Sequence, residues 1–284
     1  MTIRDHLVAA GARLVAAGIH PAEASLDAGL LARGVLGWDR ATLLVRELEP
    51  PSLDFLDRFT AAIDRRARRE PIAYIRGVQE FWGRDFIVSP AVLIPRPETE
   101  LIVENTLQLP GLDKLPSLIC DIGTGSGCLA ISLAKELPQS RLVATDNSAA
   151  ALEVARANAV RHGVAGRIAF AEGEYLAGAK GPFHVIVSNP PYVSDEDYAT
   201  LAPEVHDHEP ASALVAGADG LRDIREILNL AAEALMPGGV LLMEIGFDQA
   251  DVIPLRVGGL PRLALMGIAR DLQGLPRVAV VQRR

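Results

Sequence analysis

Over the first seventy residues, apolar side chains recur at every third or fourth position, which is the spacing of one buried helix face. The first such series is Ile3, Leu7, Ala10, Leu14 and Ala17. Pro21 suits the first turn of a second helix that Gly37 would end, and Ser52 suits the N-cap of a further helix. These patterns predict a small N-terminal helical domain over residues 1–72.

Four arginines, Arg65, Arg66, Arg68 and Arg69, close this helical segment. The carboxyl end of a helix carries a partial negative charge, so cations are favoured there. We therefore interpret the four side chains as a solvated helix end.

From residue 73 to residue 96, short aromatic and β-branched runs replace the helical pattern. Phe81-Trp82-Gly83 and Phe86-Ile87-Val88 are two such runs around a glycine, which predicts a β-hairpin. Pro90, Pro95 and Pro97 follow, and their fixed φ angles favour extended backbone there. We expect a β-hairpin linker over residues 73–96.

Beyond Pro97, apolar strand-like runs alternate with helical patterns. Strands are predicted at residues 117–122, 141–145, 167–170, 183–187, 240–245, 262–268 and 277–281. Helices are predicted at residues 127–137, from a Ser148 N-cap to Gly163, and along an apolar stripe from Ile224 to Leu235 that Pro237-Gly238-Gly239 would end. Repeated strand–helix–strand units predict a doubly wound α/β sheet over residues 97–284.

Composition and charge narrow the possible classes of protein. The chain has 284 residues, a formal net charge of −8 and two cysteines, so we expect a globular protein of the reducing cytoplasm rather than a disulfide-stabilised one. No apolar run reaches the roughly 18–20 residues that cross a bilayer, and the first residues do not resemble a secretory signal. The net negative charge also argues against a protein whose main function is to bind nucleic acid, unless a local basic patch offsets it.

A glycine-rich loop follows the first predicted strand of the sheet. It reads Asp121-Ile122-Gly123-Thr124-Gly125-Ser126-Gly127, and Asp146 ends the next strand, nineteen residues after Gly127. Glycines at this turn let a ligand approach the backbone, and a carboxylate at the next strand end can accept hydrogen bonds from both ribose hydroxyls of an adenosine. The pattern resembles the S-adenosylmethionine site of class I methyltransferases, with a nicotinamide site or a purely structural turn as alternatives.

Asn189-Pro190-Pro191-Tyr192 directly follows an almost continuously apolar strand, at the sheet edge where ligands of open α/β sheets bind. The Asn189 side-chain oxygen and the Pro190 carbonyl could each accept one N–H of a planar NH2 group, and the two prolines restrict the backbone that carries them. Tyr192 could pack its ring against the planar group. These residues predict methylation of a conjugated nitrogen, with Asn189 and Pro190 catalytic; an ordinary Asn-Pro-Pro turn is the alternative.

The chain as a whole resembles the protein-(glutamine-N5) methyltransferases that modify peptide chain release factors, the PrmC/HemK family. The likeness covers nearly the whole chain and includes residues 69–75 with Gly77, Glu80–Gly83, Leu93–Glu100, Asp121–Gly127, Val187–Tyr192, Asp271–Gly274 and Arg277-Val278. Residues 69–100 are the most specific part, because general nucleic-acid methyltransferases with the Asn-Pro-Pro-Tyr motif lack them. The resemblance implies a Rossmann-like class I methyltransferase fold.

The resemblance also implies a substrate and a cofactor. The methyl acceptor would be the side-chain amide of the glutamine in the Gly-Gly-Gln loop of class 1 release factors, docked by the helical domain and the hairpin and held by Asn189, Pro190, Pro191 and Tyr192. The residues implied to bind S-adenosylmethionine are Gly123, Thr124, Gly125, Ser126, Gly127, Asp146 and Asn189. We expect a monomer that needs no metal and binds neither nucleic acid nor a membrane.

Several residues and functions stay open. Glu174 falls where relatives often have a tryptophan or another residue beside the adenine. Glu98 could lie near the cofactor or the motif, and Arg96 could help order the loop; a salt bridge between hairpin and sheet is the alternative for both. His206-Asp207-His208 lacks companion metal ligands and is interpreted as a solvated loop. The alternative functions are methylation of DNA adenine or rRNA guanine, methylation of a ribosomal protein glutamine, cofactor binding without turnover, and a nicotinamide oxidoreductase.

Overall fold

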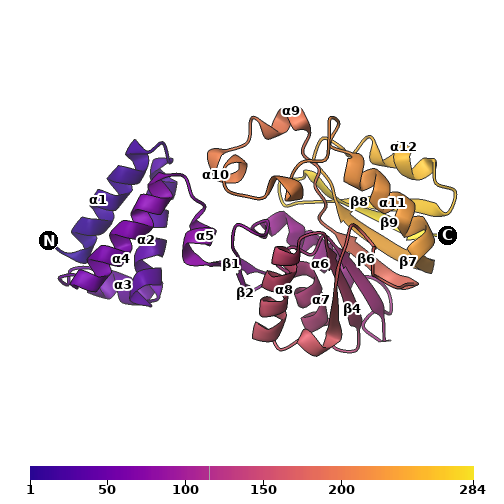
Figure 1. The fold of residues 1–284 in the computed structure, drawn as a ribbon, viewed down its shortest axis with the longest axis horizontal. Coiled ribbons are helices and arrows are strands. Elements are labelled where there is room, and N and C mark those ends of the chain that lie inside the picture. The colour runs from indigo at the N-terminus through magenta and orange to yellow at the C-terminus, as the bar shows by residue number, and fades with distance from the viewer. Residues whose placement is uncertain (115) are drawn as a thin grey trace. The chain divides into compact units, whose positions relative to one another are not determined.

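The computed structural model describes residues 1–114 and 116–284, which form two compact units. The helical unit is Met1–Val78 with Ala202–His208, and the sheet unit is Gln79–Leu201 with Glu209–Arg284 (Figure 1). Ala202–His208 thus packs with the helical unit although it lies inside the predicted 97–284 domain. The domain boundaries at residues 72 and 96 stay a prediction.

The helical unit contains the helices that the apolar spacing predicts. They are α1 (Ile3–Ala16), α2 (Pro21–Leu36) and α4 (Leu53–Ala67). Their ends form as expected, because Gly37 caps α2 at a φ of 67° and the Ser52 side chain accepts the Phe55 N–H at the start of α4. Three shorter helices have no clear sequence pattern: α3 (Arg40–Arg46), α5 (Ile72–Arg76) and α10 (Pro203–His206).

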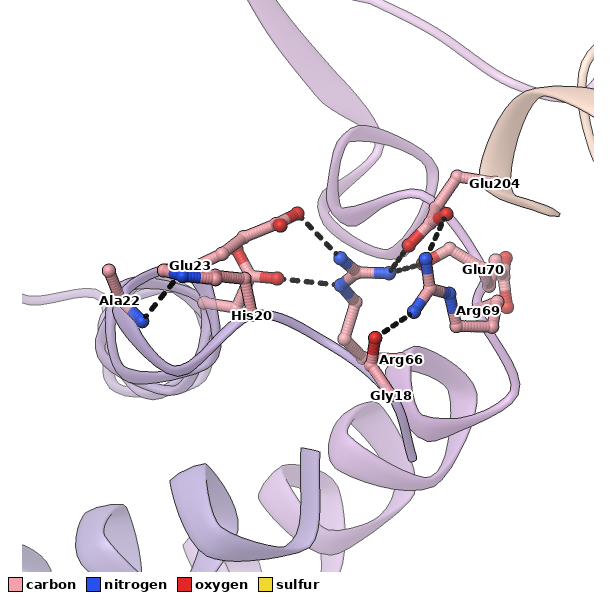
Figure 2. Close-up of polar contacts among 9 residues, drawn as sticks. Gly18, His20, Ala22, Glu23, Arg66, Arg69, Glu70 and Glu204 are labelled. Atoms are coloured by element: carbon pink, nitrogen blue, oxygen red, sulfur yellow. Dashed lines mark hydrogen bonds and ion pairs between the residues drawn. The ribbon is translucent and has the colours of Figure 1, made fainter. Parts of the chain in front are cut away.

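Arg66 corrects the interpretation of the four arginines as a solvated helix end, because its side chain is only 2% exposed. Its guanidinium donates from Nε to Asp27 at 2.6 Å, from Nη2 to Glu23 at 2.9 Å and from Nη1 to Glu204 at 2.9 Å (Figure 2). Glu204, on α10, also accepts from Arg69 at 2.7 Å. A guanidinium has five donors in a planar fork, so it can be buried where carboxylates satisfy them.

A two-stranded sheet confirms the predicted hairpin. β1 (Val78–Phe81) and β2 (Arg84–Ile87) are joined by Trp82 and Gly83, which have φ angles of 52° and 67°. Two positive φ angles are typical of the type I′ turn, whose twist matches that of hairpin strands. The Trp82 N–H donates to Glu100 at 2.7 Å, which fastens the turn to α6 (Glu100–Leu107).

The sheet unit is built on seven strands in the order β5-β4-β3-β6-β7-β9-β8. The strands are β3 (Leu118–Ile122), β4 (Arg141–Asp146), β5 (Ile168–Glu172), β6 (Phe183–Ser188), β7 (Leu235–Glu244), β8 (Leu263–Arg270) and β9 (Pro276–Arg283). The five strands from β5 to β7 are parallel, and β9 is antiparallel to both of its neighbours. The predicted doubly wound α/β sheet is therefore confirmed, with a strand at each predicted run.

Alternate residues of the central strands pack into two apolar clusters, one on each face of the sheet. On β6, Val185 and Val187 share a cluster with Leu133, whereas Ile186 shares the other with Ile227. The first face is covered by α6, α7 (Cys128–Glu136) and α8 (Ala149–Arg161), and the second by α11 (Arg222–Ala234) and α12 (Ile253–Gly258). The remaining elements are α9 (Asp195–Tyr198), η1 (Pro97–Thr99), η2 (Ala165–Arg167) and η3 (Ala211–Ala213).

One predicted helix end is wrong. The apolar stripe places Leu235 in a helix, but α11 ends at Ala234 and Leu235 opens β7. The pairing of β6 with β7 shifts register between Phe183 and Val185. Pro237-Gly238-Gly239 therefore lies within β7, at an irregularity of the strand.

Among the described residues, no helix has the length and apolar character needed to cross a bilayer.

Candidate active site

A cleft with a volume of about 540 Å³ opens at the carboxyl ends of β3, β4 and β6. The chain passes from β3 to α7 on one face of the sheet and from β6 toward α11 on the other, which makes this the switch point where ligands of such sheets bind. The predicted site residues that line it are Gly123, Thr124, Gly125, Ser126, Asp146, Asn189, Pro190 and Pro191. The structure thus brings the two sequence motifs together, while Gly127 and Tyr192 are not among the described lining residues.

The glycine loop combines an open side with a packed side. Gly123, Gly125 and Gly127 have φ angles of 69°, 53° and 82°, which other residues rarely adopt. A Cβ on Gly123 or Gly125 would meet no described atom within 4 Å, whereas a Cβ on Gly127 would lie 2.9 Å from Ile131 Cδ1 and 3.2 Å from Ala155 Cβ. Gly127 therefore lets α7 pack against α8, and the other two glycines leave room for a ligand.

Asp121 supports the glycine loop through hydrogen bonds. It is not among the described residues that line the cleft. Its Oδ2 accepts hydrogen bonds from Thr124 Oγ1 at 2.6 Å and from the Ala130 N–H at 3.1 Å. Complete burial raises the pKa of Asp121 to about 7, although these hydrogen bonds lower it. The other oxygen, Oδ1, is buried without a hydrogen-bond partner among the described residues.

Asp146 is the carboxylate that faces the cleft from the end of β4. Its Oδ2 accepts the Gly125 N–H and its Oδ1 accepts the Ser148 N–H, both at 2.9 Å. Burial raises the pKa of Asp146 above its ordinary value, while the backbone donors lower it. A carboxylate has about four acceptor positions, so both oxygens can still accept hydroxyl donors such as those of a ribose.

Asn189 is anchored by a buried chain of hydrogen bonds. Its Nδ2 donates to Thr99 Oγ1 at 3.0 Å, and the Thr99 hydroxyl donates to Glu244 Oε2 at 2.6 Å. The Tyr192 hydroxyl donates to the other Glu244 oxygen at 3.1 Å. Thr99 and Glu244 are 2% and 1% exposed, so water does not compete for these bonds. The arrangement leaves the side-chain oxygen of Asn189 available to another donor.

Thr99 and Glu244 are residues that the sequence reasoning missed. Glu244 is the one acidic residue of the apolar strand β7, and a charge at such a position was the available signal. Burial raises the pKa of Glu244 to about 7. Tyr192 engages Glu244 through its hydroxyl, and the predicted packing of its ring against a substrate stays a prediction.

Arg96 and Glu98, whose roles the sequence left open, have different charged neighbours. Arg96 forms an ion pair with the buried Glu209, which also accepts the Ile94 N–H at 3.0 Å. This pair joins the proline-rich segment to the chain after α10 rather than the hairpin to the sheet. Glu98 lies close enough to Glu244 to raise the pKa of that acid.

Two other features that the sequence left open are Glu174 and the run His206-Asp207-His208. Glu174 lines the cleft, and its contact with an adenine stays untested. The exposed His206 and Asp207 contact each other at 2.6 Å. Within residues 1–114 and 116–284, no group of three or more His, Cys, Asp and Glu side chains could hold a metal ion.

Two family models match the chain. The PrmC N-terminal domain matches residues 5–77, and the methyltransferase small domain matches residues 99–208.

Named relatives match the chain over most of its length. The release factor glutamine methyltransferase of Geobacter sulfurreducens is 41% identical over 262 residues, which cover 90% of this chain and 88% of the relative. That of Cereibacter sphaeroides is 40% identical over 280 residues, which cover 98% and 97%. A 16S rRNA methyltransferase of T. thermophilus, solved in complex with AdoMet and guanosine, has a TM-score of 0.51 and 16% identity over 73% of this chain and 50% of that chain. The last likeness shows a shared fold alone.

Proposed function

The chain belongs to the release factor glutamine methyltransferases, and from this premise we propose how its cleft performs the reaction. The substrate is a class 1 peptide chain release factor, and the product carries one methyl group on the side-chain amide nitrogen, N5, of the glutamine in its Gly-Gly-Gln loop. The names of the relatives do not favour nucleic-acid methylation, ribosomal protein methylation, an adaptor without turnover or a nicotinamide oxidoreductase.

The residues of the cleft fit S-adenosylmethionine. The sides of Gly123 and Gly125 are open to a ligand, and Asp146 offers acceptor positions suited to ribose hydroxyls. We assign cofactor binding to Gly123–Gly127, Asp146 and Asn189, with Gly127 acting through the packing of α7. When bound, S-adenosylmethionine supplies an electrophilic methyl group on a sulfonium sulfur and leaves as S-adenosylhomocysteine.

Asn189 and Pro190 orient the acceptor. The glutamine amide nitrogen is a weak nucleophile because its lone pair is delocalised into the carbonyl group. The Asn189 Oδ1 and the Pro190 carbonyl each accept one N–H of this NH2 group, and Pro190 and Pro191 restrict the backbone between them. We assign glutamine binding to Pro191 and Tyr192 as well, Pro191 as part of the cleft lining and Tyr192 next to it, with its hydroxyl on Glu244.

The chemical role of these acceptors is positional and electrostatic. Transfer of the methyl group to the amide nitrogen would place positive charge on that nitrogen, which would then lose one proton to water. Two fixed oxygen acceptors stabilise the N–H groups while they carry that charge. They also hold the nitrogen in one orientation, so no strong base is needed for the transfer.

The observation that carries the proposal is the meeting of the glycine loop, Asp146 and Asn189–Pro191 in one cleft. Mass spectrometry of a release factor incubated with the protein and S-adenosylmethionine tests it. We expect one added methyl group, located on the glutamine of the Gly-Gly-Gln loop.

Four parallel incubations complete this test. A release factor with that glutamine replaced by asparagine should stay unmodified. Duplex DNA, rRNA and ribosomal protein should take up no labelled methyl group under the same conditions. Methylation of one of these, with none on the release factor, would overturn the proposal.

The proposal extends to the state of the protein. We expect a monomer, since the proposed cleft is complete within one chain. Light scattering after gel filtration measures this directly. We also expect the reaction in the cytoplasm, without nucleic acid or a membrane as partner, and cell fractionation tests that location.

A further inference from the structure

The orientation of the Asn189 amide matters for the proposed reaction. Its oxygen and its NH2 group are similar in size, and a half-turn of the amide exchanges them. Only one orientation offers Oδ1 to an N–H of the acceptor glutamine. The side chain that contacts the NH2 end is Thr99, whose Oγ1 lies 3.0 Å from Asn189 Nδ2.

The Thr99 hydroxyl has a single proton, and the group that receives this proton determines whether Thr99 donates a hydrogen bond to Asn189 or accepts one from it. An ionised carboxylate only accepts hydrogen bonds, so Glu244 takes the Thr99 proton on Oε2 and the Tyr192 proton on Oε1. Thr99 is then left with only lone pairs toward Asn189. Lone pairs attract the NH2 group and repel the amide oxygen, so Oδ1 turns away from Thr99.

We propose that Thr99 and Glu244 are positioning residues of the methyl transfer, which hold the side-chain oxygen of Asn189 toward the acceptor amide. The inference rests on the proposed role of Asn189. It adds Thr99 from η1 and Glu244 from β7 to the residues that orient the acceptor, which the sequence predicted from the Asn-Pro-Pro-Tyr motif alone.

The charge of Glu244 controls this arrangement. Burial is the main cause that raises its pKa to about 7; Glu98 raises it as well, while Thr99, Tyr192 and Arg277 lower it. Arg277 is itself paired with Asp271 at 2.9 Å. Burial raises the pKa of the Cys128 thiol on α7, and the charge of Glu244 contributes to raising it.

Protonation of Glu244 would remove the constraint on Asn189. A protonated carboxyl group can donate to Thr99, and the Thr99 hydroxyl can then donate to Asn189 Oδ1 and hold the amide the wrong way round. Glu244 is protonated below its pKa and ionised above it. Turnover should therefore fall as the pH drops through about 7 and rise above it.

Threonine variants of the full-length protein test the positioning role. The measured quantities are kcat and KM for release factor methylation at saturating S-adenosylmethionine, and the cofactor dissociation constant from calorimetry. Thr99→Val keeps the shape and removes the acceptor, so kcat should fall by about tenfold or more, with KM and cofactor affinity within about twofold of wild type. Thr99→Ser restores the hydroxyl and should recover most of the loss.

A matched control comes from the same region. Thr106 is another fully buried threonine, and its hydroxyl donates to the Ile102 carbonyl, away from the cleft. Thr106→Val removes a similar buried hydrogen bond and should leave kcat close to wild type. Rates are expressed per cofactor-binding site, so a variant that folds poorly does not count as one that positions poorly.

The pH profile separates positioning from support of the fold. Wild-type kcat should show a limb near pH 7, and Glu244→Gln, which has no group to titrate there, should lose it. Wild-type kcat in Thr99→Val, a loss of cofactor affinity equal to the loss of kcat, or a persisting limb in Glu244→Gln would each overturn the inference. Different results would contradict the proposed function itself: no methyl group on the glutamine, or full turnover in Asn189→Ala.

Discussion

Arg66 provides a quantitative test of how burial governs ion pairs in the helical unit. Arg66→Met keeps much of the side-chain volume and removes the guanidinium that meets three carboxylates (Figure 2). The side chains of Asp27, Glu204 and Glu23 are 5%, 18% and 54% exposed. Breaking a buried pair costs about 3–5 kcal/mol because the remaining charge keeps its desolvation penalty. We expect Arg66→Met to lower the free energy of unfolding of this unit by that amount, mainly through Asp27.

Fluorescence can follow the helical unit by itself. The chain has two tryptophans, and Trp38 lies in the helical unit while Trp82 lies in the sheet unit. Urea unfolding in a Trp82→Phe background therefore reports on the environment of Trp38. The control is Glu23→Gln, which removes the most exposed of the three carboxylates and should cost less than about 1 kcal/mol.

Two further variants sharpen the same experiment. Arg66→Lys keeps the charge but not the planar fork, so its loss should be intermediate. Asp27→Asn added to Arg66→Met removes the stranded charge and should recover part of the loss. The reasoning would be refuted if Arg66→Met destabilised the unit no more than Glu23→Gln does.

Four other predictions concern the cleft and the glycine loop beside it. Asn189→Ala should lower kcat by about a hundredfold with little change in the calorimetric affinity for S-adenosylmethionine, because the acceptor loses its orienting contact while the glycine loop and Asp146 still hold the cofactor. Asp146→Ala should chiefly weaken that affinity, and near-normal turnover in Asn189→Ala would disprove its role. Gly127→Ala should lower the thermal midpoint more than Gly123→Ala, since both positions have positive φ but only the Gly127 Cβ would collide, at a typical cost of about 1–3 kcal/mol. Burial raises the pKa of Asp121 to about 7 from an ordinary value of 3.8, so the native state binds more protons than the unfolded state between these values. Stability should therefore fall as the pH rises through that window, and thermal midpoints at pH 5 and pH 8 should differ less in Asp121→Asn.

The sheet unit could largely be predicted because its signals are local. A parallel strand buried on both faces is apolar almost throughout, as in Phe183–Ser188, and helix ends are marked by residues such as Ser148. The end of α11 was misplaced because Leu235 continues the helical spacing although it pairs with Phe183 of β6. Pairing between strands is a tertiary effect that spacing along the chain does not encode.

The candidate site was only partly predictable for a similar reason. The glycine loop and the Asn-Pro-Pro-Tyr motif are contiguous, so their residues can be found by spacing. The link from Asn189 to Glu244 joins residues far apart in the chain through Thr99. The carboxylate partners of Arg66 are likewise 39, 43 and 138 residues away, and a charge pattern read locally therefore suggested a solvated end.

The helical unit is not a continuous stretch of chain, and this limits how such proteins can be recombined. Glu204 reaches Arg66 and Arg69 from Ala202–His208, a segment inserted between strands of the other unit. An exchange of residues 1–78 between two homologous genes would transfer the arginines without the acid that neutralises them. Chimeras should tolerate such a swap only when the short 202–208 segment comes from the same parent, so that the two separated pieces are inherited together.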